Sequence, residues 1–86
     1  MSERFAENLV NLRQAAGFSQ EELAFRAAIH RTQVSLLESG KRLPRLETLI
    51  KLAGALEVSP ADMLDGIVWE PVIRTSGGLK VSGPKG

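Results

Sequence analysis

Apolar residues at helical spacing dominate the start of the chain and predict an amphipathic helix over residues 2–16. The apolar positions of this helix are Phe5, Leu9, Leu12 and Ala16. Ser2 is suited to cap its start, and Gly17 is suited to end it in a left-handed conformation.

Two shorter helices are expected next. Ser19 stands three residues before Glu22, which is the spacing of a capping box, so a second helix is expected over about residues 20–27. A third helix is expected to end near Gly40, because glycine readily adopts the left-handed conformation that stops a helix. The apolar face of this third helix carries Val34 and Leu37.

Beyond Pro44 the pattern predicts a fourth helix with one apolar stripe. The stripe consists of Leu46, Leu49, Ile50, Ala53 and Leu56. Ser59 followed by Pro60 marks the start of a brief fifth helix, because serine caps a helix and proline fits its first position. Gly66 is expected to end this helix.

The chain is therefore expected to be all-α, with a helical domain at residues 1–66 and a C-terminal extension at residues 67–86. The segment IVWEPVI is β-branched and aromatic, and Pro71 restricts it to an extended or edge conformation. The remainder is rich in Gly and Ser, so we expect a flexible tail in which order fades near Thr75.

Size and composition limit the functions open to the chain. Its 86 residues suffice for one small domain, and 43 % hydrophobic residues suffice for one core. Cysteine is absent, which excludes disulfides and thiolate metal sites and suits a reducing cytoplasm. No apolar run reaches the roughly 18 residues of a membrane span, and the charged start of the chain does not resemble a signal peptide, so no contact with a membrane is expected.

An enzyme is not expected either. The chain has one histidine and no convincing pair of nucleophile and base, and SGGLK lacks the spacing of a phosphate-binding loop. No cofactor is indicated. No metal is indicated, because no second ligand lies near His30 at helical spacing.

Positive charge is concentrated in the middle of the chain. Residues 26–51 carry a net charge of +4, whereas the whole chain carries +1. Such a segment fits a surface that faces a polyanion, and it fits a solvated charged face equally well. Charge alone leaves both interpretations open.

The segment SQEELAFRAAIHRTQVSLLESGKRLPRLETL resembles the helix-turn-helix of the Xre family, which contains the Cro proteins and repressors of lambdoid phages. The resemblance is carried by the Ser-Gln opening of the second helix, the Leu-Ala pair, the turn residue Ile29, Glu-Ser-Gly-Lys, and Pro-x-Leu-x-Thr-Leu. It covers about residues 5–64. It implies a five-helix, lambda-repressor-like fold whose third helix, about His30–Ser39, enters the major groove of double-stranded DNA.

The outward face of that third helix carries side chains that can read bases. If Val34 and Leu37 face the core, the residues left for base readout are Arg31, Thr32, Gln33, Ser35 and Leu36. Arg31 can fork onto guanine O6 and N7, and Gln33 can pair with adenine N6 and N7. Leu36 either touches a thymine methyl group or shields the core. The alternative is an ordinary solvated helix face.

Other residues are predicted to contact the DNA backbone, which positions a protein without reading sequence. The resemblance assigns a phosphate contact to Gln20, at the start of the second helix, where free amides and a short polar side chain favour an anion. The basic residues after the third helix either neutralise the adjacent strand or belong to a solvated loop. The predicted phosphate contacts are Ser19, Gln20, His30, Lys41, Arg42 and Arg45.

The resemblance also implies a partly buried ion pair between Arg13 and Glu38, with two unrelated surface charges as the alternative. Two positions depart from the family pattern. Ala28 stands where glycine is common, and alanine costs about 1 kcal/mol there if the backbone adopts a positive φ. Arg45 stands where a small capping residue is usual, which weakens the cap and adds a cation.

The leading interpretation is a sequence-specific transcriptional regulator, of bacterial or phage origin, that binds a pseudo-palindromic operator as a homodimer. Its half-sites are expected about 34 Å apart. Trp69 either anchors a contact with a second copy or folds back on its own helices. The predicted dimer contacts are Leu64, Ile67, Trp69 and Val72.

Three other functions stay open. The chain is the antitoxin of a toxin–antitoxin pair, or a restriction-modification controller protein, and in either case the tail offers a segment for a protein partner. From a different class, it is an interaction module that has kept the fold and lost DNA readout. The base-reading chemistry of Arg31 and Gln33 argues against this last function.

Overall fold

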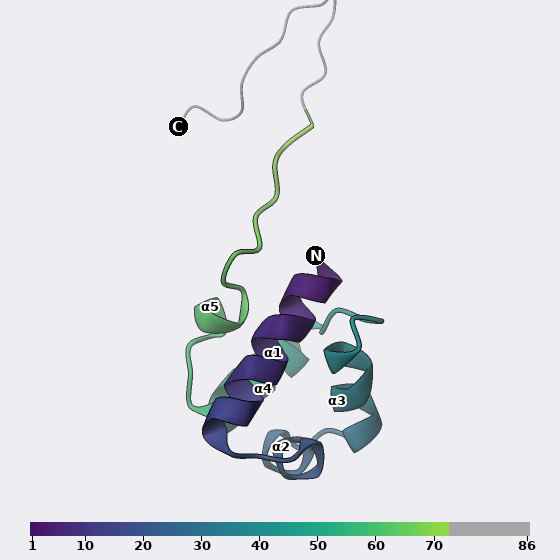
Figure 1. The fold of residues 1–86 in the computed structure, drawn as a ribbon, viewed down its shortest axis with the longest axis vertical. Helices are drawn as coiled ribbons and strands as arrows, with labels where there is room; N and C mark the ends of the chain where they lie inside the picture. Colours follow the sequence, from purple (N-terminus) through teal and green to yellow (C-terminus); the bar gives the residue numbers. More distant parts are fainter. Residues whose placement is uncertain (73–86) are drawn as a thin grey trace, which may run out of the picture.

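The computed structural model describes residues 1–72 and contains five helices in that part of the chain (Figure 1). They are α1 (Ser2–Ala16), α2 (Gln20–Ala27), α3 (Arg31–Glu38), α4 (Leu46–Leu56) and α5 (Pro60–Met63). No strand occurs within residues 1–72, so the all-α expectation is confirmed for the described residues. None of these helices is long and apolar enough to span a bilayer.

The ends of the first two helices follow the residues that predicted them, with two differences. Gly17 ends α1 with φ 79°, and the Oγ of Ser19 accepts a hydrogen bond from the Glu22 amide at 3.0 Å. Ser2 is not the cap of α1, because the helix already begins there and Met1 is the residue that precedes it. The Glu22 carboxylate does not reach back to Ser19; it accepts from Arg26 Nε at 2.7 Å.

All five helices contribute large side chains that are fully buried in one core, and these come from segments far apart in the sequence. They are Phe5, Leu9, Leu23, Val34, Leu52 and Met63. In Figure 1 helix α1 crosses α4, α2 lies across one end of the bundle, and α3 runs along its side. Helix α2 packs against both α3 and α4, so the position of α3 is fixed by contacts with the rest of the bundle.

The predicted apolar stripe of α4 is partly wrong. Leu46 and Ile50 are 75 % and 52 % exposed, and Leu52, which the predicted stripe omitted, is fully buried. The sequence LETLIKLAGAL has aliphatic residues on most sides of the helix, so its periodicity fits more than one stripe. Packing against α1 and α2 selects the face that is buried, which consists of Leu49, Leu52, Ala53 and Leu56. Ala16 of α1 was likewise expected on the apolar face and is exposed.

Helix α5 ends at Met63, three residues before the predicted stop at Gly66. Two side chains of α1 hold the chain that follows: Asn8 Nδ2 donates to Met63 O at 3.0 Å and to Asp65 O at 2.9 Å, and Arg4 Nε donates to Asp65 O at 3.2 Å. Gly66 has φ +79°, and a Cβ atom built there would lie 2.6 Å from the Arg4 guanidinium. The positive φ favours glycine here, whereas the Arg4 guanidinium ends a flexible, half-exposed side chain that can shift to make room for a Cβ atom.

Beyond Gly66 the described chain has no regular structure, and residues 67–72 lead away from the helices (Figure 1). Ile67 packs partly against the core. The predicted flexible tail, including the loss of order near Thr75, lies outside the described residues.

Candidate nucleic-acid interface

Helices α2 and α3 form a two-helix motif with a turn of three residues, Ala28, Ile29 and His30. Ala28 ends α2 in the left-handed region with φ 57° and ψ 43°, so this alanine does adopt the conformation that favours glycine. Ile29 is half-buried and packs against the core, which anchors the turn. The turn conformation and the packing of Ile29 thus hold α3 in a fixed position relative to α2.

One face of α3 packs into the core and the other is free. Val34 and Leu37 are 0 % and 4 % exposed, and Leu36 is half-buried. The exposed residues of α3 include four of the five predicted base-reading residues: Arg31, Thr32, Gln33 and Ser35. These side chains therefore stand on a helix face that a nucleic acid can approach.

Gln33 has a structural task besides the predicted readout. Its Oε1 accepts a hydrogen bond from the His30 amide at 3.2 Å, which caps the start of α3. A carbonyl oxygen has two lone pairs, and the amide nitrogen keeps both donors, so the cap leaves Gln33 chemically able to meet a base. It also fixes the orientation of the Gln33 amide.

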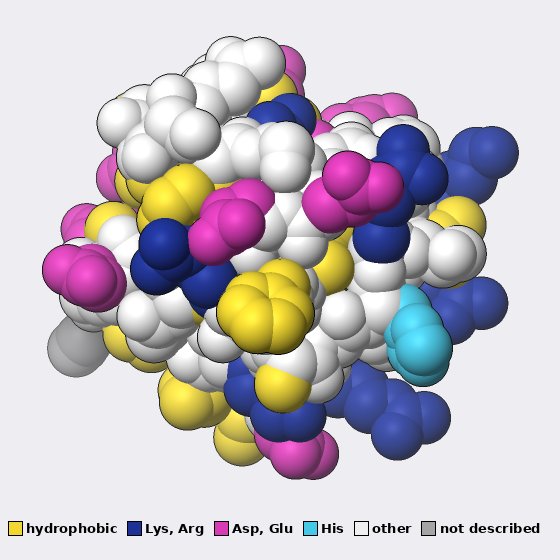
Figure 2. Space-filling view, turned by 90° about the horizontal axis from the view of Figure 1, so that it is seen from below, with side chains coloured by type: hydrophobic (Ala, Val, Ile, Leu, Met, Phe, Trp, Pro, Cys, Tyr) yellow, Lys and Arg dark blue, Asp and Glu magenta, His cyan; other side chains and the backbone are white. Residues whose placement is uncertain are grey.

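Lys41, Arg42 and Arg45 are all exposed in the segment between α3 and α4, and none forms an ion pair within residues 1–72. Arg45 precedes α4 without a side-chain cap, as its departure from the family pattern predicts. Figure 2, which looks at the α2 end of the molecule, has Lys and Arg side chains gathered along one edge beside the histidine. This part of the surface is therefore cationic.

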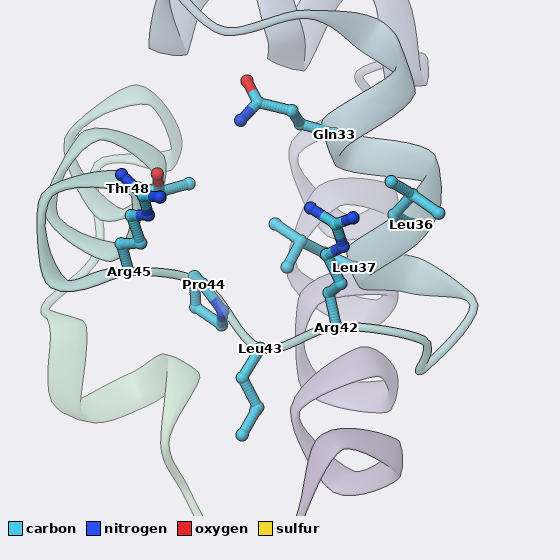
Figure 3. Close-up of a pocket in the computed structure, with 8 residues that line it drawn as sticks. All are labelled: Gln33, Leu36, Leu37, Arg42, Leu43, Pro44, Arg45 and Thr48. Carbon is cyan, nitrogen blue, oxygen red and sulfur yellow. The ribbon is translucent and has the colours of Figure 1, made fainter.

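A hollow of about 110 Å³ lies between α3 and the start of α4 (Figure 3). Gln33 points from α3 toward the α4 side of the hollow, and Leu43 points away from it. Its lining combines an aliphatic part from α3 with polar and cationic side chains. The lining residues are Gln33, Leu36, Leu37, Arg42, Leu43, Pro44, Arg45 and Thr48.

Sequence reasoning missed two polar residues beside this hollow. Thr48 and Lys51 line an adjoining hollow together with His30 and Gln33, and Lys51 Nζ lies 3.4 Å from Glu47 Oε2. The helical spacing of α4 contains the signal, because Lys51 falls off the buried face and on the same side as Glu47, one turn earlier.

At the start of α2, Ser19 is exposed and Gln20 is half-buried. Gln20 Nε2 donates a hydrogen bond to Glu38 Oε1 at 2.9 Å, a contact that the sequence did not indicate. The side chain predicted to contact a phosphate is therefore already hydrogen-bonded through its amide nitrogen to Glu38.

The Arg13 and Glu38 side chains form a two-bond ion pair, Nε to Oε2 at 2.6 Å and Nη2 to Oε1 at 3.0 Å. They are 14 % and 6 % exposed. Arg13 Nη1 also donates to Phe18 O at 2.8 Å, which ties down the turn between α1 and α2. The hydrogen bond to Glu38 raises the pKa of Arg13, while burial acts in the opposite direction.

Among residues 1–72 no group of three His, Cys, Asp or Glu side chains is placed to hold a metal ion. The arrangement instead offers hydrogen-bond donors, acceptors and cations around one exposed helix face. Such an arrangement, on the second helix of a two-helix motif, defines the class of helix-turn-helix DNA-binding proteins.

Several known proteins are similar to the chain. Control protein C.BamHI of Bacillus amyloliquefaciens is 44 % identical over 50 residues, which are 58 % of this chain and 62 % of that protein. The cryptic phage CTXphi transcriptional repressor RstR of Vibrio cholerae is 39 % identical over 56 residues, which are 65 % of this chain and 50 % of that protein. The crystal structure of the restriction-modification controller protein C.AhdI from Aeromonas hydrophila matches with a TM-score of 0.70 and 39 % identity, over 72 % of this chain and 94 % of that chain.

The aligned part of the chain spans 62 % and 50 % of the lengths of the first two relatives. A family model described as helix-turn-helix, HTH_3, matches residues 9–63. The chain belongs to this helix-turn-helix family, which confirms the resemblance to Xre-type proteins.

Proposed function

We propose that this protein binds a pseudo-palindromic operator as a homodimer, with α3 in the major groove, and thereby regulates transcription from the adjacent promoter. The observation that carries the proposal is the free face of α3, where Arg31, Thr32 and Ser35 are exposed while Val34 and Leu37 are buried. Bases are read by side chains of this kind on an exposed helix. A bacterial regulator of this kind works in the cytoplasm, where the DNA is.

The cations beside α3 support a second part of the proposal, contact with the phosphate backbone. Lys41, Arg42 and Arg45 are exposed and form no ion pair within the described residues, so they are available to replace counterions on DNA. The other proposed phosphate contacts are Ser19, Gln20 and His30. These contacts set the register of α3 on the duplex without reading its sequence.

The exposed apolar residues after α5 support dimerisation. Trp69 and Val72 are 71 % and 78 % exposed and Leu64 is 41 % exposed, whereas Ile67 is half-buried. The high exposure of Trp69 supports contact with a second copy over packing against its own helices. Two copies give an operator with two half-sites about 34 Å apart.

The test is selection of bound duplexes from a random DNA library, followed by affinity measurements for the selected duplex and a scrambled one at two salt concentrations. We expect an inverted repeat that binds at least about 1,000-fold more tightly than scrambled DNA. Weak, steeply salt-dependent binding with no enriched sequence would contradict the proposal and favour an interaction module.

A restriction-modification controller is a second candidate, favoured by the similarity to C.BamHI and C.AhdI. A controller would bind the operator of its own restriction and modification genes, whereas an antitoxin would bind a toxin through a segment such as the tail. Placing the selected operator on the source genome separates these possibilities. An operator upstream of genes for a DNA methyltransferase and an endonuclease is the outcome expected of a controller.

A further inference from the structure

The Glu38 carboxylate, at the end of α3, connects three helices. Arg13 of α1 bonds both of its oxygens, and Gln20, the first residue of α2, donates from Nε2 to Oε1 at 2.9 Å. Glu38 is only 6 % exposed and is held by two hydrogen bonds from Arg13, so its carboxylate has little freedom to move. The exposed start of α2 is thus tied to a rigid group.

The contact with Glu38 decides which way the Gln20 amide faces. An ionised carboxylate only accepts hydrogen bonds, so the nitrogen of the Gln20 amide must face Glu38. That nitrogen carries two N–H groups, and Glu38 takes one of them. The other remains a donor on a half-buried side chain beside the exposed Ser19. An untethered glutamine could turn its oxygen outward instead, and that oxygen cannot bond a phosphate.

Arg13 makes this arrangement compatible with a nearby polyanion. A lone carboxylate close to a phosphate would oppose binding by repulsion between like charges. The hydrogen bond to Glu38 raises the pKa of Arg13, so the guanidinium stays charged and balances the carboxylate. Neutralised in this way, Glu38 orders Gln20 without repelling DNA.

We propose that Glu38 is a positioning residue for DNA binding, which orients the Gln20 amide so that its second N–H contacts a phosphate of the operator backbone. The inference rests on the operator binding proposed above and adds the residue that orders one phosphate contact. Ordering Gln20 before binding removes a loss of side-chain freedom that complex formation would otherwise incur.

A double-substitution cycle on operator affinity tests the inference. Gln20→Ala is expected to weaken binding about tenfold, because a hydrogen bond to a charged group is lost. Glu38→Gln is expected to weaken binding in the unsubstituted protein and to have no further effect when residue 20 is already alanine. The matched control is Asn8→Ala. It loses two hydrogen bonds to the backbone carbonyls of Met63 and Asp65, away from α2, and should leave operator affinity unchanged.

A second experiment replaces single phosphates of the operator, in turn, by neutral methylphosphonates and measures the affinity each time. A purely structural role of Glu38 would not change the response at one particular phosphate. The unsubstituted protein and Asn8→Ala should lose affinity when the phosphate that faces Gln20 is neutral. Gln20→Ala and Glu38→Gln should not respond at that phosphate and should still respond at the others.

The outcomes separate this inference from the proposed function. One outcome is that Glu38→Gln weakens binding by the same factor in the unsubstituted protein and in the Gln20→Ala variant. Glu38 then does not act through Gln20, so the inference is overturned while operator binding stands. If Gln20→Ala binds as tightly as the unsubstituted protein, the phosphate contact is absent and the inference falls with it. A protein that selects no DNA sequence overturns both.

Side-chain amide NMR of the unsubstituted protein covers the case in which Glu38→Gln does not fold. The exposed Gln14 serves as the internal reference. The Gln20 amide protons are expected to exchange with water more slowly than those of Gln14, and to shift on addition of operator. Identical exchange of the two amides would show that Gln20 is not tethered and would overturn the inference.

Discussion

At the residue scale, the partly buried ion pair of Arg13 and Glu38 is the least exposed of the four ion pairs in residues 1–72. Removing one partner leaves the other charge without compensation, so Arg13→Met or Glu38→Leu alone is expected to lower the free energy of unfolding by about 3 kcal/mol. The double variant is expected to lose less free energy of unfolding than the two single variants lose together. Unfolding in urea measures all three losses, and strictly additive losses would contradict a direct interaction.

The Glu22–Arg26 pair is the matched control for that cycle. It is nearly as short as the Arg13–Glu38 pair, with Nε and Oε2 2.7 Å apart, but its side chains are 44 % and 47 % exposed. Water screens such a pair, so Glu22→Gln is expected to change the free energy of unfolding by less than about 0.5 kcal/mol. The raised pKa of Arg13 means that its charged form contributes fully to stability below the usual pKa of arginine, and that this contribution decreases as pH rises through the raised value.

Within residues 1–72, two residues that are not glycine hold left-handed backbone conformations, Ala28 with φ 57° and Glu57 with φ 58°. Glycine adopts this conformation without the steric cost of a Cβ atom, so Ala28→Gly is expected to raise the free energy of unfolding by up to about 1 kcal/mol. Ala15→Gly, in the regular part of α1, should lower it by about 1 kcal/mol. Thermal unfolding of both variants tests this, and a loss of stability in both would mean that Ala28 is not strained.

At the scale of elements, α3 and the segment after it are expected to have separate tasks. Arg31→Ala should relax the preference for one base position and cost about 1–3 kcal/mol on the selected operator. Lys41→Ala should weaken binding evenly on all sequences and reduce the slope of log affinity against log salt by about one unit. Competition between operator variants at several salt concentrations measures both effects. Identical losses on every sequence would contradict the base-reading role of Arg31.

How far sequence predicts this fold also differs from element to element. Helix ends with a local chemical cause, such as Gly17 and Ser19, were predictable because the cause lies within four residues. The buried face of α4 was not, because its aliphatic residues fit several stripes and only packing selects one. The contact of Gln20 with Glu38 joins two helices, so no local pattern carried it, whereas the Arg13–Glu38 pair was predictable from the family resemblance alone.

At the scale of the whole molecule, the exposed apolar residues divide into separate places on the surface. Leu46 and Ile50 lie on α4, Phe25 lies on α2, and Trp69 lies in the segment after α5. A small protein that leaves several large apolar side chains in water has surface available for another chain. If the protein is a homodimer, we expect that substitution in only one of these three groups of exposed residues changes the dimer dissociation constant.

Trp69 is the side chain we expect to matter most, because buried tryptophans dominate many protein interfaces. Trp69→Ala should raise the dimer dissociation constant by about tenfold or more and leave monomer stability unchanged, since the side chain is 71 % exposed. Phe25→Ala is the matched control, because Phe25 is an aromatic residue that is also largely exposed and lies outside the predicted contact. Sedimentation equilibrium measures both constants. An unchanged constant for Trp69→Ala would exclude Trp69 as the anchor, and Leu46 and Ile50 on α4 would then be the next residues to substitute.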